Sequence, residues 1–251
     1  MTTPKDILDS IFGANQTAYG PAALDDLMVF DHVKTPTDCA FAAQLPEAHK
    51  RLLAQSDGLD LLQGSYRLLG WNTPAGYGLA TWNDPETWKF AWDTTALPWV
   101  CFGWSVLGNQ FAYHMSELAQ GKTPRVYELF AATLAPVCHF DSFEVFLDAG
   151  FVNGVQDDSY HGRIAEARAQ MGGFEQGQNL AYMPSPLLTG GQLDGLELVP
   201  MTAQAHMIIN GDLHRQLAHL DTLDGLHSLD NYSDAKGRLR IRAHFSGEAK
   251  Q

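Results

Sequence analysis

The feature that most constrains the fold of this sequence is the aromatic, glycine-spaced run from Leu45 to Leu147. All 6 tryptophans lie within it, between positions 71 and 104, and glycines separate its short apolar stretches. Aromatic residues dominate protein cores and interfaces, and glycines at such intervals mark turns. The run contains no recognisable catalytic motif. The run therefore favours a protein that binds a partner or ligand over an enzyme.

The spacing of apolar residues predicts helices and strands without a strict βαβ alternation. Such a mixture favours an α+β fold, with a mainly antiparallel twisted sheet that is flanked by helices. Helix caps and breakers place helices over 37–55, 84–92, 142–149 and 203–220. Strands are expected over 64–70, 76–81, 99–104, 110–113, 125–130, 179–183, 196–200 and 237–245.

The polar and acidic segment 153–159 has the composition of a linker. We therefore predict a first domain over 1–152, which begins with a short helix over 4–12. A smaller α+β part follows over 160–251 and starts with a helix over 163–171. This second part is either packed on the first or continuous with it.

The formal net charge of -13 limits the classes of partner. An acidic surface repels phosphate backbones, so direct binding to nucleic acid is not expected. It attracts basic proteins instead, although a requirement for solubility explains the charge equally well.

The cysteines and the N-terminus bear on the compartment. Cys39, Cys101 and Cys138 form neither a disulfide framework nor a metal-ligand pattern, and the last two are expected in the core. The N-terminus lacks the features of a signal peptide, and no apolar run reaches membrane-spanning length. A cytoplasmic protein without membrane contact is expected.

The search for catalytic chemistry yields no strong motif. Residues His139 to Ser142 include the residue types of a hydrolytic triad, but neighbours in sequence do not converge on one point. The densest histidine cluster lacks the spacing of a metallohydrolase. We therefore expect no catalytic residue, no metal and no cofactor. The alternative is a small-molecule or metal-dependent hydrolase that uses the C-terminal histidines, His206, His214, His219 and His227.

The tryptophan-rich segment from Trp82 to Asp93 is the predicted partner-binding site. Trp99 and Trp104 belong to an apolar strand and are expected in the core. Partial exposure is expected for three other tryptophans because their neighbours are polar, and exposed aromatics ringed by acids suit a basic protein partner. A ligand- or glycan-binding module would use the same residue types. The predicted site comprises Trp82, Asp84, Glu86, Trp88, Trp92 and Asp93.

With these residues assembled, the segment from about residue 31 to 151 resembles the SUKH superfamily. The resemblance rests on a Pro-led helix that ends in a turn, on a Phe-Gly strand with its Gly-Asn turn, and on a late Ser-Phe-Glu-x-Phe-Leu helix. In this chain Asp57 stands where Asn is usual in the first turn. The matching elements are Leu45-Pro46 to Asp57-Gly58, Phe102-Gly103 to Gly108-Asn109, Phe111-Ala112-Tyr113, and Ser142 to Leu147.

The part over 160–251, including Tyr182 to Leu187, is similar to the second half of two-part immunity proteins of type VI secretion systems. Together the resemblances imply a SUKH-like α+β fold and a non-enzymatic immunity protein. Such proteins bind a cognate bacterial toxin, often a nuclease, and occlude its active site. The implied partner is a secreted toxin with a basic surface, bound by a monomer or a weak dimer.

Overall fold

The structure is a computed structural model that describes residues 27–30, 40–61, 64, 66–71, 77–152, 162, 164, 166, 167, 169 and 177–246. The predicted helix over 4–12, the linker over 153–159 and Cys39 lie outside these residues. So does much of the predicted helix over 163–171. Among the helices within the described ranges, none has the length and apolar character needed to cross a bilayer.

The centre of the fold is a sheet of seven strands that follow one another in chain order. Every neighbouring pair is antiparallel, which confirms the predicted α+β class with its mainly antiparallel sheet. The strands are β1 (Leu27–Val29), β2 (Gly58–Leu61), β3 (Tyr66–Leu69), β4 (Trp99–Ser105), β5 (Gln110–His114), β6 (Val126–Leu129) and β7 (Pro136–Phe140).

Cross-strand register divides the sheet into two faces because side chains alternate along each strand. One row pairs Asp60 with Arg67, Arg67 with Trp104, and Trp104 with Gln110. The neighbouring row contains Gly103, where an added Cβ would lie 2.3 Å from the carbonyl oxygen of Arg67. A glycine at this position therefore lets two central strands approach each other.

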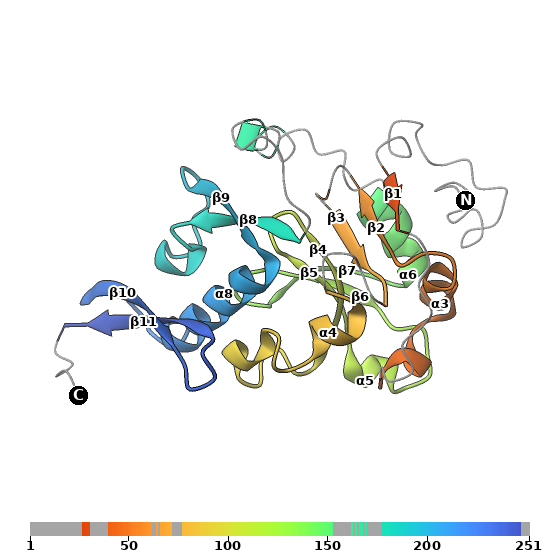
Figure 1. Cartoon of the computed structure of the whole chain (residues 1–251), viewed down its shortest axis with the longest axis horizontal. Coiled ribbons are helices and arrows are strands. Elements are labelled where there is room, and N and C mark those ends of the chain that lie inside the picture. The colour runs from red at the N-terminus through yellow and green to blue at the C-terminus, as the bar shows by residue number, and fades with distance from the viewer. Residues whose placement is uncertain are drawn as a thin grey trace.

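The face that carries Phe111 is covered by α3 (Glu47–Leu53), α6 (Phe143–Val145) and the π-helix Phe146–Val152. The ring of Phe146 lies 4.9 Å from that of Phe111. The opposite face is covered by α4 (Leu79–Asn83), the 3-10 helix η2 (Lys89–Trp92) and α8 (Ala203–Leu217). Figure 1 shows α3 and α6 near β1 and β2, and α8 beyond the other end of the sheet.

The C-terminal strands form two hairpins separate from the seven-stranded sheet. They are β8 (Gln178–Met183) with β9 (Glu197–Thr202), and β10 (Leu226–Ser233) with β11 (Leu239–Phe245). The helix between the two hairpins is not separate, because Ala203, Met207 and Ile208 of α8 belong to the main hydrophobic core. The part after residue 177 therefore packs on the first without extending its sheet. The remaining short helices are η1 (Ala42–Gln44), α5 (Met115–Leu118) and η5 (Pro186–Leu188).

Several predicted elements differ from the structure. The expected strand over 76–81 is wrong, because Leu79 and Trp82 lie one turn apart on α4 and are both buried. Gly150 does not end its helix, since the π-helix continues to Val152. Cys138 is exposed rather than in the core, because it lies on the edge strand β7. The strands β2, β7 and β10 were not anticipated from the sequence.

The last strand keeps its predicted apolar face at Ile241, Ala243 and Phe245, which pack in the cluster with α8. Its start departs from the pattern, because Leu239 is 55% exposed and Arg240 is 7% exposed. Asp212 on α8 explains the burial of Arg240. Its carboxylate accepts hydrogen bonds from the Arg240 Nε at 2.8 Å and from the backbone N–H of Ile241 at 3.0 Å. A carboxylate held by a guanidinium and a backbone donor satisfies the buried charges, so Arg240 is buried at the contact between α8 and β11.

We predict that Gly211→Ala lowers the free energy of unfolding by about 1 to 3 kcal/mol, because it overpacks a close contact. An added Cβ would lie 2.7 Å from Nε1 of Trp92 and 2.9 Å from Cβ of Ala91. The same change in an exposed helix would add about 1 kcal/mol through helix propensity. Urea denaturation measures the effect. In a Trp92→Leu background the penalty should vanish or reverse, and an unchanged penalty there would contradict the proposed contact.

Candidate functional site

The three tryptophans of the predicted partner site lie inside the protein. Trp82 and Trp88 are 0% exposed, and Trp92 is 1% exposed. Trp82 stacks at an angle on Trp104 of the sheet, with ring centres 4.7 Å apart. The prediction of partial exposure is therefore wrong for these residues. A ligand or glycan surface made of the same rings is equally unsupported by this arrangement.

Each of the three indole N–H groups has an internal acceptor. Trp82 donates to Gln110 Oε1 at 2.9 Å, and Trp88 donates to the carbonyl oxygen of Trp82 at 2.8 Å. Trp92 donates to the carbonyl oxygen of Met207 on α8, also at 2.8 Å and across 115 positions of sequence. Buried indoles need such partners. Trp82 therefore fastens α4 to the sheet, and Trp92 fastens η2 to the C-terminal helix.

The acidic residues of the predicted site are exposed, as expected, but they are engaged locally. Asp84 accepts a hydrogen bond from the backbone N–H of Glu86 at 2.8 Å, which fixes the turn that leads into η2. The carboxylate of Glu86 lies 2.5 Å from Lys236 and 2.9 Å from Arg238. These ion pairs lower the pKa of Glu86, with the hydrogen bond from Lys236 as the main cause. The side chain of Asp93 lies 3.9 Å from that of Arg215.

A buried polar contact in the same segment was not anticipated from the sequence. Asn83 accepts hydrogen bonds from Lys89 Nζ at 3.1 Å and from the backbone N–H of Cys101 at 2.8 Å. Lys89 also donates to the carbonyl oxygen of Trp99 at 2.6 Å. Burial lowers the pKa of this lysine and raises the pKa of the Cys101 thiol to about 11. The side chains of Asn83 and Lys89 thus hold α4 and η2 against β4.

The histidines have mainly structural surroundings. His206 is 5% exposed and lies 3.0 Å from Oδ1 of Asn179, and burial lowers its pKa to about 4. His214 packs on Trp92, with ring centres 5.4 Å apart. On α3, His49 lies 3.0 Å from the hydroxyl of Tyr113, and burial lowers its pKa to about 3. These histidines are neutral packing residues at pH 7.

The C-terminal histidines do not lie around a common centre. His219 and His227 are exposed, whereas His206 is buried on α8. Within the described ranges, no group of three or more His, Cys, Asp or Glu side chains is placed to hold a metal ion. The alternative of a hydrolase built on these histidines gains no geometric support.

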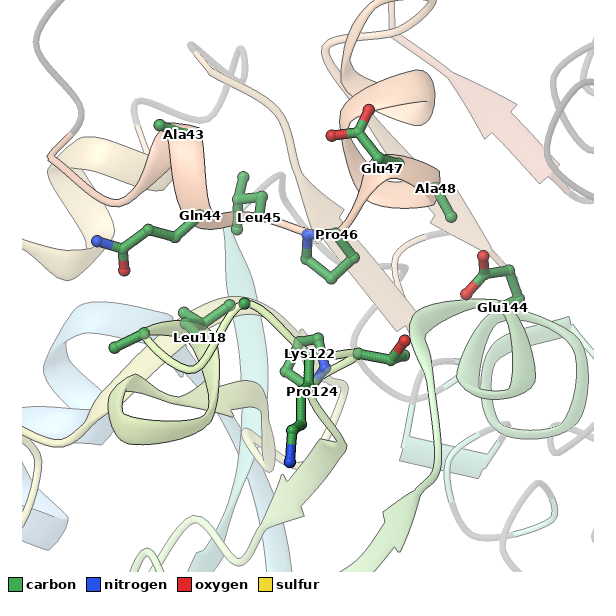
Figure 2. Close-up of a pocket in the computed structure, with 13 residues that line it drawn as sticks. Ala43, Gln44, Leu45, Pro46, Glu47, Ala48, Leu118, Lys122, Pro124 and Glu144 are labelled. Atoms are coloured by element: carbon green, nitrogen blue, oxygen red, sulfur yellow. The ribbon is translucent and has the colours of Figure 1, made fainter.

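A cleft of about 590 Å³ lies between the start of α3, the loop after α5 and the start of α6. Figure 2 shows the side chains that line it, with Glu144 on the side of Ala48 and with Lys122 extending away from Pro46. The carboxylate of Glu47 forms an ion pair with Lys50 at 2.9 Å. The cleft is open and its charges are mixed, and its residues do not form a nucleophile, base and anion site.

A comparison with known proteins finds no family model and no curated protein that matches the chain. The crystal structure of Atu4351 from Agrobacterium tumefaciens matches with a TM-score of 0.46 at 16% sequence identity. That match covers 75% of this chain and 86% of Atu4351.

The buried His206 predicts a loss of stability in acid. Because burial lowers its pKa from 6.5 to about 4, the unfolded chain takes up a proton that the folded protein does not. The contribution of His206 to the free energy of unfolding is fully present above pH 6.5. It falls by up to about 3 kcal/mol as the pH drops toward 4.

His206→Gln, which cannot titrate, should therefore lose less stability than the wild type between about pH 7 and pH 4.5. Urea denaturation at several pH values measures the difference. His219→Gln, at an exposed position of the same region, is the control. Equal acid sensitivity of wild type and His206→Gln would refute the role given to His206.

Proposed function

We propose that this chain is a cytoplasmic, non-enzymatic immunity protein that binds a bacterial toxin with a basic surface and blocks its active site. The proposal agrees with the motifs that resemble the SUKH superfamily and with the similarity of the C-terminal part to immunity proteins of type VI secretion systems. Its physical support comes from how the charges are distributed over the described residues.

The observation that carries the proposal is that the cations of the C-terminal part are all engaged, whereas several of its exposed carboxylates are not. Each of the five Lys and Arg residues in 177–246 contacts a carboxylate or lies over an aromatic ring. Within the described residues, four exposed carboxylates of the same part have no ion-pair partner: Asp194, Glu197, Asp221 and Asp224. The cations of this part are therefore engaged within the protein, and these four carboxylates face solvent without an ion-pair partner.

Such a surface fits a partner whose own function demands positive charge. Enzymes that act on nucleic acid gather Lys and Arg around their substrate phosphates. An acidic protein competes for that surface by charge complementarity, which also speeds encounter and suppresses wrong partners. A toxin of the nuclease class is the partner that this charge suits best.

The interior supports a binding role by holding the surface in place. The tryptophans fill the space between sheet and α8, and their N–H groups are satisfied internally. A surface that is already ordered loses little conformational entropy when a partner binds.

The direct test takes the product of the neighbouring gene as the candidate toxin domain. We expect that the two purified proteins form a complex with a dissociation constant of about 10⁻⁹ M or tighter, as strong inhibitor pairs do. Affinity should fall as salt rises, because the complementary charges are then screened. Co-expression should restore growth of cells that produce the toxin domain.

A toxin domain of the same class from an unrelated locus is the control, and it should neither bind nor be neutralised. Failure to bind the adjacent toxin, together with continued killing during co-expression, would refute the proposed function.

A further inference from the structure

A second hollow of about 560 Å³ lies at the C-terminal end of α8, and we call it the α8 groove. Three segments far apart in the sequence line it. They are the turn between β6 and β7 around Phe130 to Thr133, the loop from Pro186 to Gly191, and the end of α8 with the residues that follow, Leu217 to Leu223. None of these residues belongs to the segment that the sequence singled out as a partner site.

The floor of the α8 groove is apolar. Leu217 belongs to the buried cluster between α8 and β11, and Leu187, Leu220 and Leu223 pack against that cluster while remaining partly exposed. Leucines that are half-covered on a concave surface release water when an apolar side chain enters, and this favours binding. The groove therefore has the size and lining for one or two apolar side chains.

Buried hydrogen bonds hold the walls in fixed positions. Asn210 of α8 is 3% exposed and donates to the carbonyl oxygen of Ala131 at 3.1 Å, which ties the β6–β7 turn to the helix. The loop after β8 is closed by a hydrogen bond from the Gly191 N–H to the carbonyl oxygen of Pro186 at 2.8 Å. Gly190 has a φ of 65°, and no atom lies within 4 Å of where its Cβ would be, so the loop presents open backbone to the groove.

The charged side chain that lines the α8 groove is negative. Asp221 is the charged residue among those that line it, and it is exposed. Asp224 and Asp194 follow the lining segments closely in sequence, and both are exposed. The C-terminal end of the 15-residue helix α8 adds partial negative charge from its last carbonyl groups. Arg215 in the last turn of α8 is engaged by Asp212 and Asp93. A Lys or Arg side chain beside the groove would therefore meet attraction from Asp221 and from the end of the helix.

This combination selects one kind of occupant. A second copy of the chain carries the same net charge of -13 and would be repelled. We propose that the α8 groove receives a segment of a basic protein that inserts an apolar side chain onto Leu220 and Leu223 and sets flanking Lys or Arg side chains against Asp221 and Asp224. This inference rests on the proposed function and names the surface through which the toxin is bound.

The test compares two variants of the groove with a charge-matched control. Asp221→Lys combined with Asp224→Lys reverses the rim, and Ala218→Trp fills the groove from an exposed position. Asp141→Lys combined with Glu166→Lys makes the same change in net charge at exposed positions outside the groove. Far-UV circular dichroism and thermal unfolding confirm that all three variants are folded.

Isothermal titration with the adjacently encoded toxin domain is expected to show at least about tenfold weaker binding for both groove variants, because rim charges and buried contacts each contribute at interfaces. The control should stay within about twofold of the wild type. If the toxin binds the wild type and both groove variants equally well, the groove proposal is overturned while the proposed function stands.

A second probe tests binding to the α8 groove without depending on which toxin is used. It is a fluorescein-labelled peptide of two leucines flanked on each side by two lysines, with glutamates replacing the lysines in a control peptide. Fluorescence anisotropy should show that the lysine peptide binds the wild type and the Asp141/Glu166 control but neither groove variant. If the toxin fails to bind but the lysine peptide behaves this way, the groove is retained and the immunity role is lost. If the lysine peptide binds all variants equally or none, and the toxin does not discriminate among them, the groove proposal is wrong.

Discussion

The packing of α8 on the tryptophan segment is the constraint on which the other features of the molecule depend. Trp92 gives its N–H to the backbone of α8, and Gly211 leaves room for the indole ring. This contact brings Met207 into the core of the seven-stranded sheet. It also fixes Asp212, which holds Arg240 of β11, so the last hairpin takes its position from the same helix. The end of α8 then forms one wall of the acidic groove.

Much of the sheet was predictable because its signals are local. Alternating apolar residues and the Gly108-Asn109 turn predict β4 and β5, and Ser142 predicts the helix that it caps through the N–H of Val145. The strand expected over 76–81 failed because six residues with two glycines fit a strand or a helix equally well. Tertiary burial of Trp82 decides in favour of the helix.

The candidate site was mostly not predictable, for the same physical reason. Polar neighbours such as Asp84 and Glu86 suggest exposure for Trp82 and Trp88, but burial depends on what covers a residue in three dimensions. Trp82 packs between Trp88 and Trp104, and Trp92 is covered by α8, which comes more than a hundred positions later. Single-sequence patterns carry no record of these contacts. The acidic residues were expected at the surface, and they are exposed. The groove at the end of α8 is visible only after three distant segments have met.

Negative charge and buried tryptophans thus have separate roles, with the aromatics as internal support and the acids as the outer surface. Hydrogen–deuterium exchange of the protein with and without the adjacently encoded toxin domain tests this division most directly. Binding should slow exchange in 186–191 and 217–224 and leave 82–93 unchanged. Slowed exchange confined to 82–93, with no change around the groove, would contradict it and return the partner surface to the tryptophan segment.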